Sequence, residues 1–336
     1  MKQKFTLDQI LKNAKNEQVT QLDLSGNNIG DNDAIEIAKF LKENNTLISL
    51  NLRNTRLNDK CAIEIVNSLK ENLTLTVLDL SVNQIGNEGA MEIGKSLKNN
   101  LTLNSLYLNH NKINTNGALE IGKLLKENHS LTELDLSFNM IGDNDAIEIG
   151  NSLKENHSLT TLNLSSNLIG IDGVLKIAQS LKENCTLTML DLSINKVKDN
   201  GALELAEALK VNHTLTYLNL SNCWLHTSFQ SLQDLLLKDK SKLIKIMVSD
   251  EKTQQILDQY LNRNQKHLKD SIETVLLSQK RCKKRKQEQT ATGIEKAVSS
   301  LPKNLIFTIF SNLIPFSNQK LKAQDVPKFI NNLKLK

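Results

Sequence analysis

The stretch LTELDLSFNMIG at residues 131–142 recurs as LTTLNLSSNLIG at 159–170 and as LTVLDLSVNQIG at 75–86. Self-similarity at a fixed period is the sequence signature of a stacked repeat architecture. The first leucine of each Leu-x-Leu pair recurs at a constant interval of 28 residues, at Leu22, Leu50, Leu78, Leu106, Leu134, Leu162, Leu190 and Leu218. Eight units without one insertion predict an array built from a single structural unit.

Each unit has two halves with different apolar periods. In the first half the apolar residues alternate, as Leu134 and Leu136 do, which is typical of a short strand with one buried face. Asn139 follows at a turn, where its amide can bond backbone groups of adjacent turns and form a ladder along the stack. The second half, residues 142–156, has helical spacing, and its apolar face is formed by Ala146, Ile149 and Leu153. Stacking such units buries a continuous core.

The repeated pattern LxxLxLxxNxI/L covers residues 19–237 and resembles the leucine-rich-repeat family of the ribonuclease-inhibitor type. This resemblance implies an α/β fold, a horseshoe-shaped solenoid with a parallel sheet on its concave side and helices on its convex side. Similar repeats occur in the Ran GTPase-activating proteins and the NOD-like receptors, which share a binding surface rather than a reaction. We therefore expect a solenoid, followed by an α-helical C-terminal region.

Two units depart from the pattern at the asparagine position. Thr55 stands there in the second unit and Cys223 in the eighth. Cysteine is an accepted alternative in the resembled family, which implies a ladder role for Cys223 rather than a reactive thiol. Ahead of the first unit, residues 1–18 are expected to form a helix that covers the open end, with Thr6 and Gln9 spaced as a capping box.

Strand residues beside the buried leucines are expected to point into the concave face. One column of these residues is nearly all Asp or Asn and another nearly all Ser, as expected of a solvated face copied by duplication. The breaks are more informative, because Tyr, Trp, Arg and Met are enriched at protein interfaces. For Trp224, packing against the following helix is the favoured role. The candidate partner-binding residues are Arg53, Arg56, Val77, Tyr107, His110, Glu133, Met189, Tyr217 and Trp224.

No combination of residues indicates a catalytic, metal or cofactor site. His129, His157 and His213 occupy equivalent helix-to-strand turns, so we interpret them as turn residues copied by duplication. The glycines recur singly and form no phosphate-binding loop. The four cysteines share no CxxC spacing, which argues against a disulfide framework or a zinc site and is typical of a reducing compartment. We therefore predict a protein that is not an enzyme and that uses no cofactor or metal.

Composition and the N-terminus indicate where the protein acts. With 39% hydrophobic and 24% charged residues, the chain has the composition of a soluble globular protein. The apolar runs are too short to span a bilayer, so we expect no transmembrane segment. Residues 1–15 lack the continuous apolar region and small-residue cleavage site of a Sec-type signal. These features predict a cytoplasmic location.

The net charge of +5 is the sum of two opposite parts. Residues 1–226 carry 21 basic and 27 acidic groups, a net −6, whereas residues 227–336 carry 21 basic and 10 acidic groups, a net +11. Helix-spaced apolar residues at 250–288 predict a helical extension over 238–288 that caps the solenoid. It ends in a basic run composed of Lys280, Arg281, Lys283, Lys284, Arg285 and Lys286.

The basic run has four interpretations. It is a solvated helix end before a linker, a nuclear-import signal, a nucleic-acid contact or a contact to an anionic membrane. Nucleic acid is the least favoured partner, because no aromatic residue or glycine lies nearby to support base stacking.

Residues 299–336 follow a linker at 289–298 and contain the motif LPxxLIxxIFSxL. The motif resembles the opening helix of an F-box and the shortened F-box-like tails of poxviral and bacterial ankyrin-repeat proteins. This resemblance implies docking onto the Skp1 subunit of a cullin ubiquitin ligase. Only 23 residues follow Leu313, too few for a full F-box, so an ordinary terminal helix is the alternative. The apolar stripe consists of Leu301, Pro302, Leu305, Ile306, Ile309, Phe310 and Leu313.

The sequence thus predicts a non-enzymatic protein–protein interaction protein that binds its partner on the concave face. An F-box-like tail would make it a substrate adaptor, and the Lys-, Asn- and Ile-rich composition of an AT-rich genome would suit an effector of an intracellular bacterium in a host cytosol. The alternatives are a small-GTPase regulator or NOD-like sensor, and a scaffold directed to the nucleus or a membrane. The uniform repeats lack the loop insertion of Ran activators, which argues against GTPase activation.

Overall fold

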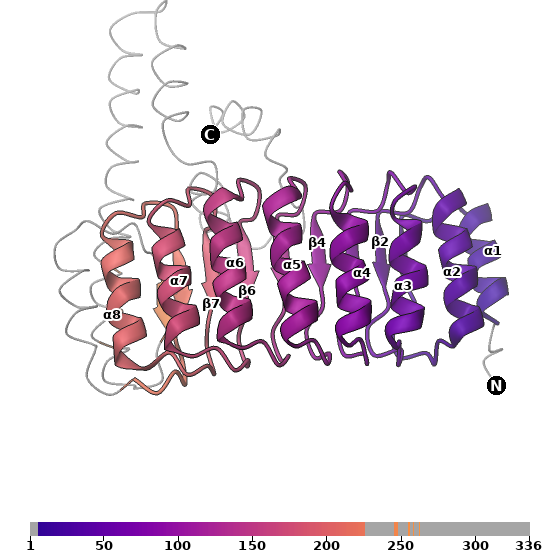
Figure 1. The fold of residues 1–336 in the computed structure, drawn as a ribbon. Helices are drawn as coiled ribbons and strands as arrows, with labels where there is room; N and C mark the ends of the chain where they lie inside the picture. Colours follow the sequence, from indigo (N-terminus) through magenta and orange to yellow (C-terminus); the bar gives the residue numbers. More distant parts are fainter. Residues whose placement is uncertain (1–5, 226–244, 248–254, 256–257, 259–261, 263–336) are drawn as a thin grey trace, which may run out of the picture. The chain divides into compact units, whose positions relative to one another are not determined.

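The computed structural model describes residues 6–225, 245–247, 255, 258 and 262. The chain divides into two compact units, Met1–Gln265 and Lys266–Lys336, and all described residues belong to the first. In Figure 1 the helices stand side by side in front of the strands. The expected segment boundaries at 18/19, 237/238 and 288/299 stay predictions.

Helices and strands alternate along the described chain. The helices are α1 (Leu7–Asn16), α2 (Asp31–Glu43), α3 (Asp59–Ser68), α4 (Asn87–Leu97), α5 (Thr115–Glu127), α6 (Asp143–Glu155), α7 (Ile171–Leu181) and α8 (Lys198–Leu209). The strands are β1 (Gln21–Asp23), β2 (Ser49–Asn51), β3 (Val77–Asp79), β4 (Ser105–Tyr107), β5 (Glu133–Asp135), β6 (Thr161–Asn163), β7 (Met189–Asp191), β8 (Tyr217–Asn219) and β9 (Lys245–Met247).

The strands form one parallel sheet, in which each strand pairs with the next along the chain from β1 to β9. The register places equivalent residues of adjacent repeats opposite each other, as with Leu78, Leu106 and Leu134. Neighbouring strands lie about 4.8 Å apart, whereas packed helices need about 8–10 Å. The sheet side is therefore the shorter, inner side of the array, and we call it the sheet face. This arrangement confirms the predicted α/β solenoid.

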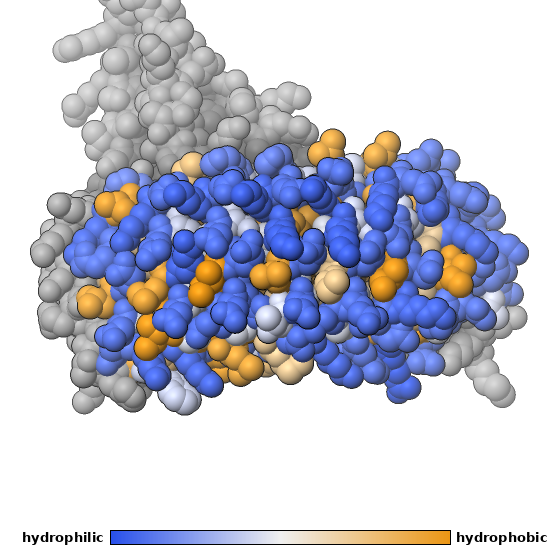
Figure 2. Space-filling model, viewed as in Figure 1, coloured by the Kyte–Doolittle hydropathy of each residue, from blue (hydrophilic) through white to orange (hydrophobic). Residues whose placement is uncertain are grey.

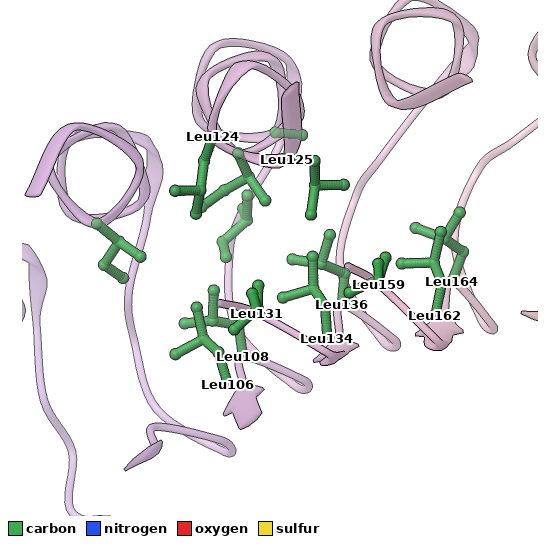
Figure 3. Packing of buried hydrophobic residues seen from close by; sticks show 14 of the residues in the cluster. Leu106, Leu108, Leu124, Leu125, Leu131, Leu134, Leu136, Leu159, Leu162 and Leu164 are labelled. Carbon is green, nitrogen blue, oxygen red and sulfur yellow. The ribbon is translucent and has the colours of Figure 1, made fainter. Parts of the chain in front are cut away.

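The core lies between the sheet and the helices. Figure 3 shows the strand leucines of three adjacent repeats, among them Leu106, Leu134 and Leu162, below the helices that cover them. These leucines are fully buried, as are the predicted core residues of α6: Ala146, Ile149 and Leu153. Burying a leucine stabilises a fold by about 1.5–3 kcal/mol, so the repeated core supplies most of the driving force for stacking.

The outer surface of the helices is largely polar. Figure 2 shows a hydrophilic surface crossed by a row of apolar residues, one over each helix of the array. Ion pairs connect neighbouring helices, such as Lys60–Asp31 and Lys126–Glu155, with nitrogen–oxygen distances of 2.7 and 2.9 Å. Each residue of the apolar row comes directly after a buried Ala or Val in the sequence of its helix, and most of these residues are only partly accessible. The row consists of Ile35, Ile63, Met91, Leu119, Ile147, Leu175 and Leu203.

The predicted asparagine ladder is present. The Asn139 Nδ2 donates to the carbonyl oxygens of Leu136 (3.1 Å) and, in the preceding repeat, Leu108 (3.0 Å). The Asn139 Oδ1 accepts a hydrogen bond from the backbone N–H of Ile113 at 3.1 Å. One buried side chain therefore serves backbone groups of two adjacent repeats, which otherwise would lie buried without partners.

The two departures from the ladder behave differently. The Cys223 Sγ donates to the Leu192 carbonyl at 3.1 Å, and burial raises the pKa of this thiol to about 11. The predicted ladder role of Cys223 is thereby confirmed. The Thr55 Oγ1 donates to the carbonyl of Leu52 in its own repeat at 2.6 Å and lies 3.3 Å from the Asn83 Oδ1 of the next repeat, but it makes no bond to the repeat before it. A shorter side chain cannot bridge to the preceding repeat, so the ladder has a gap there.

A second ladder, which the repeat pattern did not predict, runs along the helix-to-strand turns. The Asn156 Nδ2 donates to the Leu125 carbonyl of the preceding repeat at 2.6 Å. The Asn156 Oδ1 accepts from the backbone N–H groups of Ser158 (3.1 Å) and Leu159 (2.7 Å). The equivalent buried residues are Asn44, Asn72, Asn100, Asn128, Asn184 and Asn212.

The first turns of α3, α4 and α6 are connected by hydrogen bonds to the start of the helix of the following repeat. The Asp143 Oδ1 accepts from the backbone N–H groups of Gly170 (2.7 Å) and Gly173 (2.9 Å), at the start of α7. A carboxylate there also offsets the partial positive charge of the helix N-terminus. Asn87 makes the equivalent bonds to the start of α5. The close approach requires glycine, because a Cβ at Gly173 would lie 2.7 Å from the Ala146 Cβ.

Both ends of the array carry additional structure. At the N-terminus, the Gln9 N–H donates to the Thr6 Oγ1 at 3.4 Å and the Thr6 N–H to the Gln9 Oε1 at 3.0 Å, which confirms the predicted capping box of α1. At the other end, residues 238–288 were expected to be helical. Residues 255, 258 and 262 are helical.

The expected helical structure of residues 238–288 is wrong for residues 245–247, which form strand β9. Ile246 lies opposite Leu218, 28 residues earlier, so the repeat period continues for one more strand. The Leu220 N–H donates to the Met247 carbonyl at 2.8 Å. Without β9 the backbone groups of β8 would form an open sheet edge, which is a template for unwanted pairing.

α6 contains a fully buried carboxylate, Asp145, whose Oδ1 has no hydrogen-bond partner. Burial raises the pKa of this carboxyl, opposed by a hydrogen bond from the Gly142 N–H. A raised folded-state pKa favours the fold below the unfolded value, about 3.9, and this advantage is lost as the pH rises through the folded-state pKa. We therefore expect the unfolding free energy of the wild type, relative to Asp145→Asn, to fall as the pH rises from 4 to 7.

Urea titrations at several pH values measure this slope. The matched control is Asp33→Asn in α2, because Asp33 accepts the same bond from the Gly30 N–H at 2.9 Å but is only partly buried. The control should show a flatter dependence, and equal slopes for the two positions would contradict the assignment to burial.

Candidate protein-binding surface

The strand residues that flank the buried leucines lie on the sheet face, as predicted. The column between the leucines is half-buried and carries alternating carboxylates and amides. The Asn163 Nδ2 donates to the Asp135 Oδ2 at 3.1 Å, and the Asn219 Nδ2 to the Asp191 Oδ2 at 2.9 Å. The column is therefore a hydrogen-bonded row rather than a set of independent solvated side chains.

The serine column differs from its predicted solvated character. Ser81, Ser137, Ser165 and Ser193 are buried. The Ser81 Oγ donates to the Asp79 Oδ1 at 2.5 Å and the Ser193 Oγ to the Asp191 Oδ1 at 2.7 Å. Each of these aspartates also accepts a hydrogen bond from the backbone N–H of its serine. The serines thus hold the aspartates in place and are not a binding surface themselves.

Tyr107 breaks the Asp/Asn column at the middle of the array. The register places it between Asp79 of β3 and Asp135 of β5. Burial, followed by the charge of the neighbouring Glu133 carboxylate and a hydrogen bond with it, raises the pKa of Tyr107 to about 12. The Glu133 Oε2 also accepts from the Ser105 Oγ at 3.2 Å. We call Asp79, Tyr107, Glu133 and Asp135 the tyrosine–carboxylate patch.

The two arginines do not lie together. Arg53 is exposed on the sheet face, where its Nη1 donates to the Ser81 Oγ at 2.8 Å. Arg56 lies in the loop after β2, in the left-handed backbone region with φ of 62°. Val77, on the strand between Arg53 and Tyr107, is partly accessible. Arg53 and Val77 therefore lie close to the tyrosine–carboxylate patch, whereas Arg56 lies outside it, in the loop after β2.

The C-terminal candidates form a separate group. Met189 and Tyr217 are opposite each other on β7 and β8, and the Tyr217 Oη donates to the Met247 Sδ at 3.2 Å. Burial, followed by the charge of Asp191, raises the pKa of Tyr217. Trp224 was expected to pack on the following helix, but it is 59% exposed. Its backbone is left-handed, with φ of 57°, in the loop after β8.

His110 lies in the loop after β4 rather than on the sheet face. It stacks on Phe138 of the next repeat, with ring centroids 3.9 Å apart and an interplanar angle of 11°. Phe138 was absent from the predicted site. The sequence signal was available, because Phe138 and His110 occupy the same position of consecutive units, 28 residues apart.

The other predicted sites lie outside the described residues: the basic run at 280–286 and the F-box-like stripe at 301–313. Within the described part, no group of three or more His, Cys, Asp or Glu side chains could hold a metal ion. Among these residues Cys61 and Cys223 are buried and Cys185 is exposed, all as free thiols. No helix in the same part is long and apolar enough to cross a membrane.

Comparison with known proteins agrees with the repeat fold. The model of the family described as "Leucine Rich repeat" matches residues 15–38, 71–94, 99–122, 127–150, 155–178, 183–206 and 211–228. No curated protein matches the chain. Among solved structures, leiomodin-1 actin-binding site 2 is 27% identical, over 46% of this chain and 90% of that one, with a TM-score of 0.40. The seven matches and the single parallel sheet with its alternating helices show that the repeats of this chain form a leucine-rich-repeat solenoid of the α/β class.

Proposed function

We propose that this protein is a non-enzymatic interaction protein that holds a partner protein on the sheet face of its repeats. The observation that supports this most is the tyrosine–carboxylate patch, which interrupts an otherwise repeated surface at mid-array. Leucine-rich repeats are generally interaction modules, and the sheet face presents side chains from parallel strands that are held in fixed register. A rigid surface loses little conformational entropy on binding.

The partner that fits this patch is a basic one. Asp79, Glu133 and Asp135 surround Tyr107, and in the described residues none of the three carboxylates forms an ion pair with a basic side chain. A lysine or arginine of a partner would meet carboxylates on both sides and an aromatic ring between them. Arg53 at the N-terminal side would then face a carboxylate or a polar group of the same partner.

Affinity capture from cytosol on the immobilised full chain tests this proposal. The variant Tyr107→Asn with Glu133→Thr copies residues that already occupy the same columns, Asn163 and Thr161, so it should fold normally. We expect a captured partner to bind this variant at least tenfold more weakly, and its wild-type affinity to decrease as salt increases. Gln179→Ala, on an exposed helix position, is the control. Equal capture by the wild type and the double variant would contradict the proposal.

The adaptor role is a finer proposal that rests on the sequence of the tail alone. The apolar stripe of residues 301–313 resembles an F-box helix, and a pull-down with Skp1 tests it. We expect binding by the full chain and loss of binding by Leu305→Ala with Phe310→Ala. Absence of Skp1 binding, or binding that survives both substitutions, would remove this role while leaving the sheet-face proposal intact.

A further inference from the structure

One column of the array has an unusual backbone. The residue directly before the ladder position is left-handed in every repeat, with φ between 52° and 71°. We call it the rim column, and it consists of Gly26, Asn54, Val82, His110, Phe138, Ser166, Ile194 and Asn222. Glycine and asparagine adopt this conformation readily, whereas a β-branched or bulky residue there is an outlier.

The distribution of residues along the rim column is not uniform. The first two repeats and the last use Gly26, Asn54 and Asn222, which suit the backbone. The central repeats use valine, histidine, phenylalanine, serine and isoleucine at the same backbone angles. A left-handed conformation costs a non-glycine residue about 1–2 kcal/mol. Backbone strain that is kept at particular positions indicates that the side chains at those positions have a function.

These strained positions display apolar groups to solvent. Phe138 and Ile194 of the rim column, and Met140 and Leu168 of the neighbouring position after the ladder asparagine, are each between 45% and 53% exposed. The loops that carry them lie side by side: the Phe138 N–H donates to the Ser165 carbonyl at 3.0 Å, the Leu168 N–H to the Ile141 carbonyl at 2.8 Å and the Ser166 N–H to the Ser193 carbonyl at 2.8 Å. We call Phe138, Met140, Leu168 and Ile194 the rim patch.

Two unpaired cations border the rim patch. Lys112 and Lys196 occupy the same loop position as Met140 and Leu168, one repeat to either side, and both are exposed. Neither forms an ion pair with another described residue, whereas lysines on the helices pair with carboxylates of adjacent helices. The patch is therefore apolar at its centre and positive at both ends, the opposite charge to the sheet face beside it.

We propose that the rim patch is a docking site for a partner segment whose apolar side chains are flanked on both sides by carboxylates. Lys112 and Lys196 are three repeats apart, which corresponds to at least about 14 Å at the strand spacing. A helix spans that distance in about ten residues and an extended segment in about four. Acidic groups at that separation would reach both ammonium groups while the apolar residues between them cover the patch.

The proposal does not depend on the sheet-face function, and one experiment separates the two. A phage-displayed library of random peptides is selected on the folded full chain. We expect the selected peptides to carry apolar residues flanked by Asp or Glu. They should bind at least tenfold more weakly to a rim variant with Phe138→Ser, Met140→Gln, Leu168→Gln and Ile194→Asn. Each substitution copies a residue that already stands at that position in another repeat: Ser166, Gln84 and Asn54.

Two further variants identify the chemistry of the contact. The variant Lys112→Gln with Lys196→Gln, which copies Gln84, should weaken the binding of the acidic peptides and remove the salt dependence of that binding. The control variant Leu73→Asn with Leu101→Asn copies Asn45 and removes two exposed leucines at the opposite edge of the sheet. It should leave peptide binding unchanged. The sheet-face variant Tyr107→Asn with Glu133→Thr should also bind the peptides normally.

The unfolding free energy of the rim variant is measured in parallel. It should not decrease, because Ile194→Asn relieves a strained β-branched residue, so weaker binding cannot be attributed to unfolding. Selected peptides that lack carboxylates, or that bind the rim variant as tightly as the wild type, would overturn the proposal. Self-association of the full chain that is lost in the rim variant would overturn it too, since the occupant would then be a second copy.

Discussion

Replacing Asn156 with alanine is expected to lower the free energy of unfolding by about 3–4 kcal/mol. The substitution removes the hydrogen bonds to the Leu125 carbonyl and from the Ser158 and Leu159 N–H groups. The alanine methyl group cannot satisfy any of these backbone groups. Each polar group left buried without a partner costs about 1–3 kcal/mol. The cost arises at the junction of two repeats, so stacking as well as the local turn is weakened.

Urea denaturation followed by circular dichroism measures this loss. The matched control is the adjacent His157→Ala, because His157 is exposed in the same turn and should change the unfolding free energy by less than about 0.5 kcal/mol. The m-value of each transition should be compared as well, since an array can lose cooperativity when one junction weakens. A stability of Asn156→Ala within 1 kcal/mol of the wild type would show that the second ladder contributes little.

The second large effect is expected from Gly173→Ala, at about 3 kcal/mol. An added Cβ would lie 2.7 Å from the Ala146 Cβ, 2.9 Å from the Asp143 Oδ1 and 3.0 Å from the Ile169 Cγ2. None of these atoms lies at the far end of a long flexible side chain, so α7 must shift away from α6 to make room. Overpacking of this kind costs about 1–3 kcal/mol. The shift would also lengthen the bonds from Asp143 to the start of α7.

Gly142→Ala is the matched control for this substitution. A Cβ at Gly142 would have only the Asp145 Oδ2 nearby, at 3.9 Å, which is an ordinary contact distance. Its cost should stay below about 1 kcal/mol, the difference between glycine and alanine at a helix N-cap. Thermal melts of the two variants under one condition give the comparison. If both variants melted at the same temperature, the close approach of α6 and α7 would not be what requires glycine.

The architecture could be predicted because one constraint is repeated many times. The inward leucines, the helical spacing of Ala146, Ile149 and Leu153, and the bridging amide of Asn139 each follow from a single unit. Stacking then fixes the sheet. The pattern LxxLxLxxNxI/L does not include the asparagine of the helix-to-strand turn, so the second ladder was not predicted. The burial of this asparagine depends on the preceding repeat, which the period of a single unit does not reveal.

The binding surfaces were harder to predict, since they depend on side-chain direction rather than on periodicity. The serines were expected to be solvated, but Ser81 is buried and its hydroxyl bonds the Asp79 carboxylate. Phe138 was overlooked because alternation along a strand does not reveal a left-handed residue just beyond its end. Strand β9 was missed because its sequence, Lys-Ile-Met, lacks the Leu-x-Leu pair that defines the other units.

The two ladders also bear on how such a gene changes length. Each ladder asparagine that has a repeat before it bonds the same carbonyl position of that repeat, as Asn139 does with Leu108 and Asn167 with Leu136. Deletion or duplication of a whole 28-residue unit by unequal recombination would therefore join two surfaces whose donors and acceptors still match. A change by any other number of residues would leave amides facing the wrong groups. Selection can thus lengthen or shorten this protein only in whole units, while each unit remains free to vary at its exposed positions.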